Sequence, residues 1–225
     1  FYGCSNLTTI TVDSGNSVYD SRESCNAVVE TATNTIIAGC KNSTFPTSVS
    51  TIGECAFYGC MGITSFTIPS NISIIESWAF LDCSGLLSLN VPPTVTEFGT
   101  NVFLGCNNIQ TLEWNSKYSP ALVAGQSYPS LKSVVLGDEV TILLPYTFSN
   151  CTALESVELS PNLTRISQYA FKNCNSLTSI SFPSGLNFID SDAFQGCDNI
   201  ETVYWNYRDS IAMARVLASA SSNIK

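Results

Sequence analysis

The feature that most constrains this chain is a motif of about 23 residues that recurs along the whole sequence. Its pattern is F-x-x-C-x-x-[L/I]-x-x-apolar-x-apolar, and copies begin at Phe1, Phe57, Phe80, Phe103, Phe148, Phe171 and Phe194. The cysteines of neighbouring copies, such as Cys60 and Cys83 or Cys151 and Cys174, are 23 residues apart. Repetition at a fixed period of this length indicates a stack of similar structural units.

Two cysteine spacings are longer than one unit. The 45 residues from Cys106 to Cys151 equal about two units, and Tyr128 stands where the intervening cysteine would be. The 56 residues from Cys4 to Cys60 equal one unit and an insertion of 33 residues. We therefore predict a single domain over residues 1–225, with about eight units and an insertion at about 16–45.

The insertion contains CNAVVETATNTIIAGC, in which two apolar runs flank a polar turn, a pattern typical of a β-hairpin. Pairing residues whose numbers sum to 65 places Val29 opposite Ile36, Val28 opposite Ile37, and Cys25 opposite Cys40. Cys25 and Cys40 are therefore a candidate disulfide, with two free thiols as the alternative.

Within each unit, the L-x-x-I-x-V segment alternates as a half-buried strand does. A Pro, Gly, Asn, Asp or Ser then breaks the strand, and a second segment such as VSTIGECAF returns across the other side. One such unit cannot bury its apolar face, so neighbours must stack. The predicted fold is a mostly β solenoid with a parallel sheet on a concave face and short strands, turns and short helices on the convex side.

The last residues suggest a longer helix and an incomplete repeat. Ser210 to Ala220 is Ala-rich and has capping residues before it, which predicts a helix. Ile224 aligns with Leu131 at the start of the next strand, and the first residue already lies inside a unit. We therefore expect this sequence to be part of a longer solenoid.

Composition excludes several classes of function. The net charge of −9 and the few Lys and Arg residues argue against nucleic acid and anionic membranes. No apolar run reaches the roughly 20 residues of a membrane helix, so direct membrane insertion of this segment is not expected. The chain has no histidine, the usual general base, nucleophile activator and zinc ligand. We expect no enzyme activity, no catalytic residues and no cofactor.

The string SRESCNAVVETATNTIIAGCKN, followed by V-x-x-I-x-x-x-A-F-x-x-C at Val49–Cys60 and, with Leu for Val, at Leu163–Cys174, resembles the BspA-like leucine-rich repeats of the Treponema pallidum type. The likeness covers nearly the entire chain. Tyr128 and the segment from Gly99 to Val102 depart from the pattern without affecting the expected fold. The resemblance implies a leucine-rich-repeat solenoid of the horseshoe type.

Members of that family are typically surface or secreted proteins of host-associated bacteria, and several are regarded as adhesins. The resemblance therefore implies a non-catalytic bacterial protein at the cell surface or outside the cell. Its partner would be a protein ligand, for example a host extracellular-matrix protein or a protein on a partner cell. The alternative is a structural spacer without a ligand of its own.

The ten cysteines have a structural interpretation that needs no metal. Seven occupy the same repeat position, where a small residue fits inside the coil and predicts a ladder of buried thiols. No C-x-x-C spacing occurs, so a zinc site is not expected. Trp114 and Trp205 fall on inward strand positions and are predicted core residues.

The outward strand positions form two rows. The first is a uniform ladder of hydroxyl side chains, at Thr9, Ser65, Ser88, Thr111, Ser133, Ser156, Ser179 and Thr202. The second row varies as a recognition surface would, and its candidate binding residues are Thr67, Asn90, Glu113, Glu158, Ser181 and Tyr204, in a row that also includes Thr11 and Val135. A solvated acidic face, a contact for a basic patch of a protein partner, a calcium site and a glycosidase-like Glu113–Glu158 pair remain open alternatives.

Overall fold

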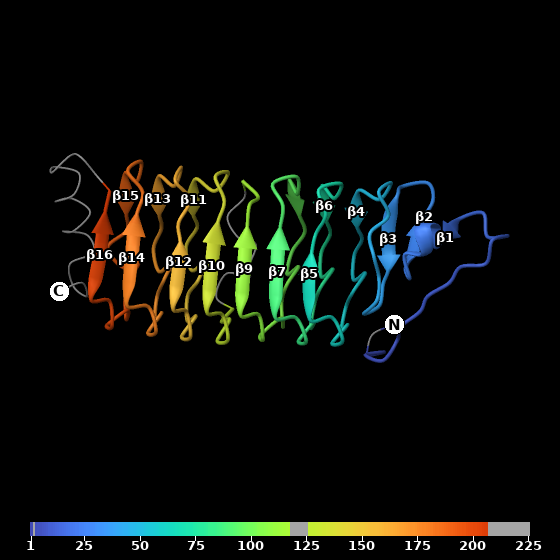
Figure 1. Ribbon diagram of the computed structural model, residues 1–225, viewed down its shortest axis with the longest axis horizontal. Coiled ribbons are helices and arrows are strands. Elements are labelled where there is room, and N and C mark those ends of the chain that lie inside the picture. Colours follow the sequence, from blue (N-terminus) through green and yellow to red (C-terminus); the bar gives the residue numbers. More distant parts are fainter. Residues whose placement is uncertain (2, 118–125, 207–225) are drawn as a thin grey trace. The chain divides into compact units, whose positions relative to one another are not determined.

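The computed structural model describes residues 1, 3–117 and 126–206 (Figure 1). The chain divides into two compact units, Phe1–Cys106 and Asn107–Lys225. Each unit is a parallel β-solenoid whose coils carry a longer strand on one side and a two-residue return strand on the other. The helix predicted from Ser210 to Ala220 lies outside the described residues.

In the first unit, the longer strands are β5 (Ser65–Thr67) and β7 (Ser88–Val91), which pair in parallel with Phe66 opposite Leu89. The return strands β4 (Thr51–Ile52), β6 (Ile74–Ile75) and β8 (Glu97–Phe98) form a second parallel ladder. The alternation read from the sequence is correct here, since Phe66 and Leu89 are buried.

The first copy of the motif differs from this prediction. Its strand segment forms no strand, although Ile10 is buried. Val12 N–H donates instead to Ser21 Oγ of the insertion (3.0 Å). The insertion therefore holds this segment by a hydrogen bond that the repeat pattern does not predict.

The insertion forms strands β1 (Tyr19–Asp20), β2 (Val28–Glu30) and β3 (Thr35–Ala38) and a short 3-10 helix, η1 (Arg22–Ser24). β2 and β3 are an antiparallel hairpin, and β3 extends the return ladder by pairing in parallel with β4. Val29 lies opposite Ile36 as predicted, but Val28 lies opposite Ala38. The predicted Val28–Ile37 pair is wrong because the register shifts between Val28 and Val29.

In the second unit, β9 (Thr111–Trp114), β10 (Ser133–Leu136) and β12 (Ser156–Glu158) form one parallel ladder. β14 (Ser179–Phe182) and β16 (Thr202–Trp205) form another. The return strands β11 (Ile142–Leu143), β13 (Arg165–Ile166) and β15 (Phe188–Ile189) pair continuously.

Repeated phenylalanine rings and thiols fill the coils. In the second unit, Phe171 stacks on Phe148 and Phe194 with ring centroids 5.4 and 5.1 Å apart. Cys174 Sγ and Cys197 Sγ approach the carbonyl oxygens of Phe148 (3.2 Å) and Phe171 (2.8 Å), so each thiol donates to the preceding coil.

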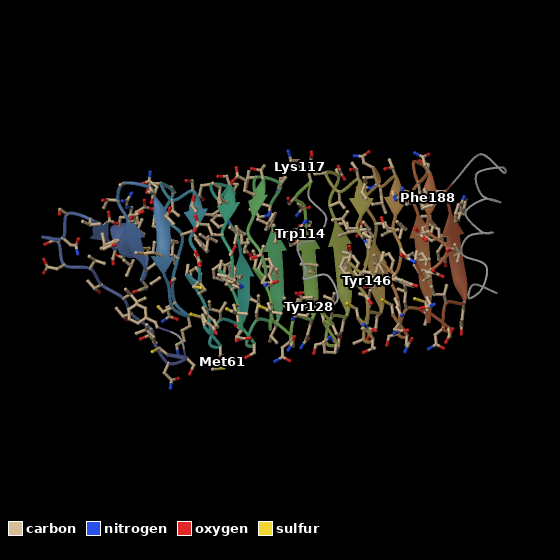
Figure 2. All side chains as sticks on the ribbon, turned by 180° about the vertical axis from the view of Figure 1, so that it is seen from behind. Met61, Trp114, Lys117, Tyr128, Tyr146 and Phe188 are labelled. Carbon is tan, nitrogen blue, oxygen red and sulfur yellow. The ribbon has the colours of Figure 1, made fainter. Side chains whose placement is uncertain are left out.

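Six of the seven predicted ladder cysteines are buried free thiols, at Cys60, Cys83, Cys106, Cys151, Cys174 and Cys197. The seventh, Cys4, is exposed, so the prediction is wrong there. Two inward aromatic positions, Trp114 and Tyr128, are buried (Figure 2). Trp205 is half-buried and packs edge-on against Phe182, with ring centroids 5.0 Å apart.

The predicted fold class, a mostly β leucine-rich-repeat solenoid, is confirmed. The return side carries the expected short strands and turns, but among the described residues the expected short helices are missing there, since η1 belongs to the insertion. Several coils have two turns with left-handed backbone, as at Tyr169 (φ 59°) and Asn173 (φ 59°), and such turns interrupt a helix. Among the described residues, none of the helices is long and apolar enough to cross a membrane.

Candidate functional site

The predicted recognition row lies on the solvent-facing side of the longer strands, which we call the long-strand face. In the first unit, Thr67 lies directly opposite Asn90 on the neighbouring strand. Thr67 is exposed and Asn90 is half-buried. The strand register therefore places the two side chains next to each other, and a role for them in binding remains a prediction.

The second unit carries the other members of the row. Glu113, Val135 and Glu158 lie opposite one another on β9, β10 and β12. Ser181 lies opposite Tyr204 on β14 and β16, and 58% of Tyr204 is exposed. Glu113, Glu158 and Ser181 are also exposed. Their participation in binding likewise remains a prediction.

The hydroxyl row runs beside this row in the same register. Ser133 lies opposite Thr111 and Ser156, and Ser156 Oγ donates to Ser133 Oγ (3.1 Å). This contact is the cross-strand hydrogen bond that such a ladder predicts. At this pair the hydroxyl row joins neighbouring coils, whereas the second row carries the more varied side chains.

The ladder of the long-strand face opens between β12 and β14 in the second unit. The N–H groups of Glu155 and Ser156 bond to Lys132 O, and those of Glu201 and Thr202 bond to Thr178 O. Across residues 155–182, all of which are described, no backbone hydrogen bond joins β12 to β14. Figure 1 shows the wider spacing of these two strands.

The opening changes the burial of one core position. Leu112, Val134 and Ile180, the equivalent residues of neighbouring strands, are each no more than 2% exposed. Val157 on β12 is half-buried instead, although the alternation predicts an inward side chain. Part of an apolar residue is therefore accessible from the long-strand face.

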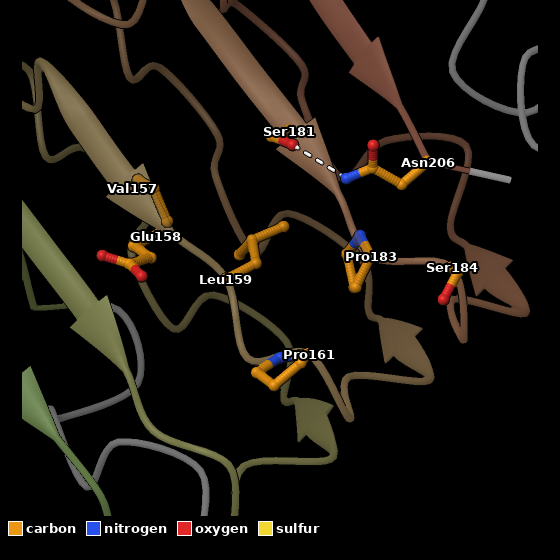
Figure 3. Close-up of a pocket in the computed structure, with 8 residues that line it drawn as sticks. All are labelled: Val157, Glu158, Leu159, Pro161, Ser181, Pro183, Ser184 and Asn206. Carbon is orange, nitrogen blue, oxygen red and sulfur yellow. Dashed lines mark hydrogen bonds between the residues drawn. The ribbon is translucent and has the colours of Figure 1, made fainter.

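A pocket of about 410 Å³ lies at this opening (Figure 3). Its lining combines apolar and polar side chains, from Val157, Glu158, Leu159, Pro161, Ser181, Pro183, Ser184 and Asn206. Asn206 Nδ2 donates to Ser181 Oγ (3.4 Å) across the pocket rim. The described part of the pocket thus contains the Glu158 carboxylate, polar oxygen atoms and a partly apolar surface.

The chain geometry explains how these residues meet. β12 ends at Glu158, and Leu163 N–H donates to Ser160 O (3.1 Å) in the turn that contains Pro161. β14 ends at Phe182, and Leu186 N–H donates to Pro183 O (3.2 Å) in the equivalent turn. β14 thus ends one repeat position later than β12, and the two turns, which contain Pro161 and Pro183, both contribute to the pocket lining.

Two of the six predicted binding residues, Glu158 and Ser181, line this pocket. Glu113 does not line it, and β10 separates Glu113 from Glu158. The sequence did not indicate the contributions of Val157, Pro161, Pro183 and Asn206. Their repeat positions are ordinary, and only the opening of the ladder makes them part of a site.

The two carboxylates considered as a glycosidase-like pair do not enclose one pocket. Glu113 and Glu158 are two strands apart, a separation of about 9.6 Å at the usual strand spacing, and Val135 lies between them. Within the described residues, no group of three or more His, Cys, Asp or Glu could hold a metal ion. The arrangement favours contact with a ligand surface over acid–base chemistry.

Cys25 and Cys40 are buried free thiols in the structure. Cys25 Sγ lies 3.7 Å from Ala27 O, and Cys40 Sγ lies 3.4 Å from Asn26 O. Burial raises the pKa of the Cys25 thiol, which disfavours the reactive thiolate. A disulfide between them stays a prediction that requires oxidation.

The comparisons with known proteins agree with this architecture. A family model described as the BspA type leucine rich repeat region matches six copies over residues 37–120 and 126–218. No curated protein matches the chain. A crystal structure of a leucine-rich repeat protein from Eubacterium ventriosum is similar, with 28% identity, a TM-score of 0.72, and coverage of 87% of this chain and 54% of that one.

Two further crystal structures share the fold. A leucine-rich repeat protein from Bacteroides ovatus has 23% identity and a TM-score of 0.53, over 86% of this chain and 52% of that one. The pneumococcal vaccine antigen PcpA has 17% identity and a TM-score of 0.55, over 97% of this chain and 48% of that one. The chain spans about half the length of each of these proteins.

Proposed function

The chain belongs to the BspA-type leucine-rich repeat family, and from this we propose that it is a non-catalytic binding module at the cell surface or outside the cell. Repeat proteins of this kind typically mediate protein–protein interaction. The partner class proposed is a protein, for example a host extracellular-matrix protein or a protein of an adhering cell. Adhesion is the biological role that this binding would serve.

The observation that carries the proposal is the contrast between the two rows of the long-strand face. Hydroxyl side chains repeat in the first row, whereas the second row presents the varied side chains of Glu113, Val135, Glu158, Ser181 and Tyr204 in the second unit. These residues stand on strands held by backbone ladders. Fixed elements bearing varied exposed side chains suit recognition, because little conformational entropy is lost on binding.

The test is a binding screen of the purified chain against immobilised fibrinogen, fibronectin, other matrix proteins and glycans. We expect saturable binding to a protein, and a loss of at least tenfold in affinity in the triple variant Glu113→Gln, Glu158→Gln, Tyr204→Ala. The matched control is Glu97→Gln, Glu139→Gln, Phe188→Ala, which removes the same charges and one exposed ring away from the long-strand face. This control should bind normally.

The second candidate is a spacer that projects another domain. It is favoured by the uniform hydroxyl row, which joins coils without offering a distinctive surface. A spacer would show no saturable binding in the screen. Equal binding by the triple variant and the wild type would instead show that the partner does not contact the long-strand face through these residues.

A further inference from the structure

We propose that the pocket between β12 and β14 receives one cationic side chain, an arginine or lysine, of the bound protein partner. This inference rests on the proposed function, because it supplies the chemistry of a contact within a protein interface. It goes beyond that function by assigning a ligand class, a cationic side chain, to this pocket. The occupant is a side chain on a partner surface.

The opening between β12 and β14 is large enough for one long side chain and is partly apolar. The pocket of about 410 Å³ has room for a long side chain and its shell of contacts. Apolar surface is accessible there because the strand ladder is interrupted beside Val157. Covering Val157, Leu159 and the two prolines would remove apolar area from water, which contributes roughly 25 cal/mol per Å². A flexible aliphatic stem can follow such a surface.

The polar groups of the lining can accept hydrogen bonds from a cationic side chain. Glu158 contributes a carboxylate, and the described residues of the lining include no lysine or arginine. Asn206 already uses its Nδ2 group to donate to Ser181 Oγ, which leaves Asn206 Oδ1 as an acceptor. The Glu158 carboxylate, Asn206 Oδ1 and the serine hydroxyls can all accept hydrogen bonds from a donor-rich cation, whereas the carboxylate would repel an anion.

Arginine fits better than lysine. Its guanidinium presents several N–H donors in a plane and can bond both oxygens of a carboxylate, whereas an ammonium acts as a point charge. Both residues carry an apolar stem that can pack while the charged group stays near water. The pocket offers an apolar surface beside Glu158, which matches this division of the side chain.

The charge of the whole chain favours the same partner. The net charge of −9 attracts a basic surface and repels an acidic one. Glu155 is exposed directly before β12, and Glu201 is exposed directly before β16, the strand that leads to Asn206. A partner with a basic patch would therefore be attracted at long range and fixed by one inserted side chain.

The experiment titrates the ¹⁵N-labelled chain with N-acetyl-arginine methylamide and follows the amide signals of Val157, Glu158, Ser181 and Asn206. We expect saturable shifts with a dissociation constant on the order of millimolar. The lysine analogue should bind a few-fold more weakly. N-acetyl-citrulline methylamide, a neutral compound of the same shape, should give no saturable shift. Equal binding of the citrulline and arginine compounds would overturn the proposal.

Two variants complete the test. Glu158→Gln should weaken arginine binding at least tenfold, whereas Glu139→Gln removes the same charge from an exposed position outside the pocket and outside the recognition row, and should bind as the wild type does. Unchanged binding in Glu158→Gln would also overturn the proposal. Since Glu158 is exposed, the variant should fold, and its amide spectrum verifies this.

The experiments distinguish failure of the cation-pocket proposal from failure of the protein-binding function. Suppose that the wild-type chain binds a matrix protein, that the triple variant does not bind it, and that binding of the arginine compound never saturates. The chain then binds proteins without a cation pocket. If the arginine compound saturates at the pocket and no protein binds, the pocket inference stands and protein binding as the function is wrong.

Discussion

Four buried cysteines of the repeat, Cys83, Cys106, Cys174 and Cys197, hydrogen-bond through their thiols to a backbone carbonyl of the preceding coil. Cys83 Sγ lies 3.0 Å from Phe57 O and Cys106 Sγ lies 3.2 Å from Phe80 O, so the thiol donates to a carbonyl that the strand ladders do not use. Burial raises the pKa of Cys60 and of Cys151 to about 12. These thiols are therefore protonated donors at neutral pH and poor nucleophiles.

We predict that native alkylation separates the cysteines into two groups. Iodoacetamide at pH 8 should modify Cys4 and Cys55, which are exposed, and leave the six ladder cysteines unmodified until the chain is unfolded in urea. Reaction at Cys55 should be slower than at an ordinary exposed thiol, because partial burial and Glu54 raise the pKa of Cys55 and so reduce its thiolate fraction. Peptide mass mapping gives the result. Rapid modification of Cys174 in the folded chain would contradict the thiol ladder.

The insertion depends on one arginine. Arg22 Nε donates to both carboxylate oxygens of Asp20 (2.8 and 3.0 Å), and Arg22 Nη1 donates to Asn34 Oδ1 (2.9 Å) in the hairpin turn. The hydrogen bond from Arg22 lowers the pKa of Asp20 below its ordinary value of 3.8. Because the folded pKa is depressed, this stabilisation is present above pH 3.8 and is lost as the pH falls through the folded pKa.

We predict that Asp20→Asn lowers the free energy of unfolding by about 0.5–1 kcal/mol at pH 7, the range for a partly exposed ion pair. Asparagine retains Oδ1 for the backbone N–H of Arg22 but removes the charge together with the Oδ2 acceptor of Arg22 Nε. Urea unfolding of both proteins from pH 7 to pH 2 should show the difference shrinking toward zero at the acidic end. A constant difference would mean that the charge is not responsible.

At the scale of the turn, each coil bends where the backbone is left-handed. Asn173 has φ 59° and its Nδ2 donates to Asn150 Oδ1 (2.7 Å) in the preceding coil. Gly196 has φ 77° one coil later. A Cβ on Gly196 would lie 2.3 Å from Asn173 Oδ1, so an added side chain there meets both a left-handed backbone angle and the neighbouring amide.

We predict that Gly196→Ala destabilises the second unit by about 1–3 kcal/mol, from left-handed strain and the contact with Asn173. Gly185→Ala is the matched control, because its φ is not positive and its Cβ would lie 3.8 Å from Pro161 O. This control should change stability by less than about 0.5 kcal/mol. Adding Asn173→Gly to Gly196→Ala should recover the part of the lost free energy of unfolding that comes from the contact with Asn173. Urea unfolding measures this difference.

At the scale of the whole molecule, stability within each unit comes from contacts between neighbouring coils. In the second unit, Phe148, Phe171 and Phe194 form one continuous stack, with each coil contributing one ring. Such proteins are stabilised by nearest-neighbour interfaces more than by single repeats. Damage in one coil should therefore spread to the coils on either side of it.

We predict that Phe171→Ala lowers the free energy of unfolding by roughly 3–5 kcal/mol, as expected for a buried ring. Amide hydrogen exchange should increase in β12 and β16 as well as in β14, because the stack is interrupted on both sides. Exchange followed by mass spectrometry measures this segment by segment. Faster exchange confined to β14 would show that the coils are stabilised independently.

The repeat alone determined the coil. The 23-residue spacing, the alternation in L-x-x-I-x-V and the strand-breaking residues predicted the parallel strands, the two outward rows and most of the buried cysteines, because these follow from periodicity and burial. Val29 could be placed opposite Ile36 for a similar reason, since the hairpin turn fixes the nearest pair.

The tertiary structure decided what the repeat could not. The register shift at Val28, the absence of a strand in the first copy of the motif, and the opening between β12 and β14 all depend on how one segment meets another. Val157 has the same type of position as Val134, yet only Val157 is accessible. Periodicity specifies which way a side chain points, whereas its exposure depends on whether the neighbouring strand closes over it.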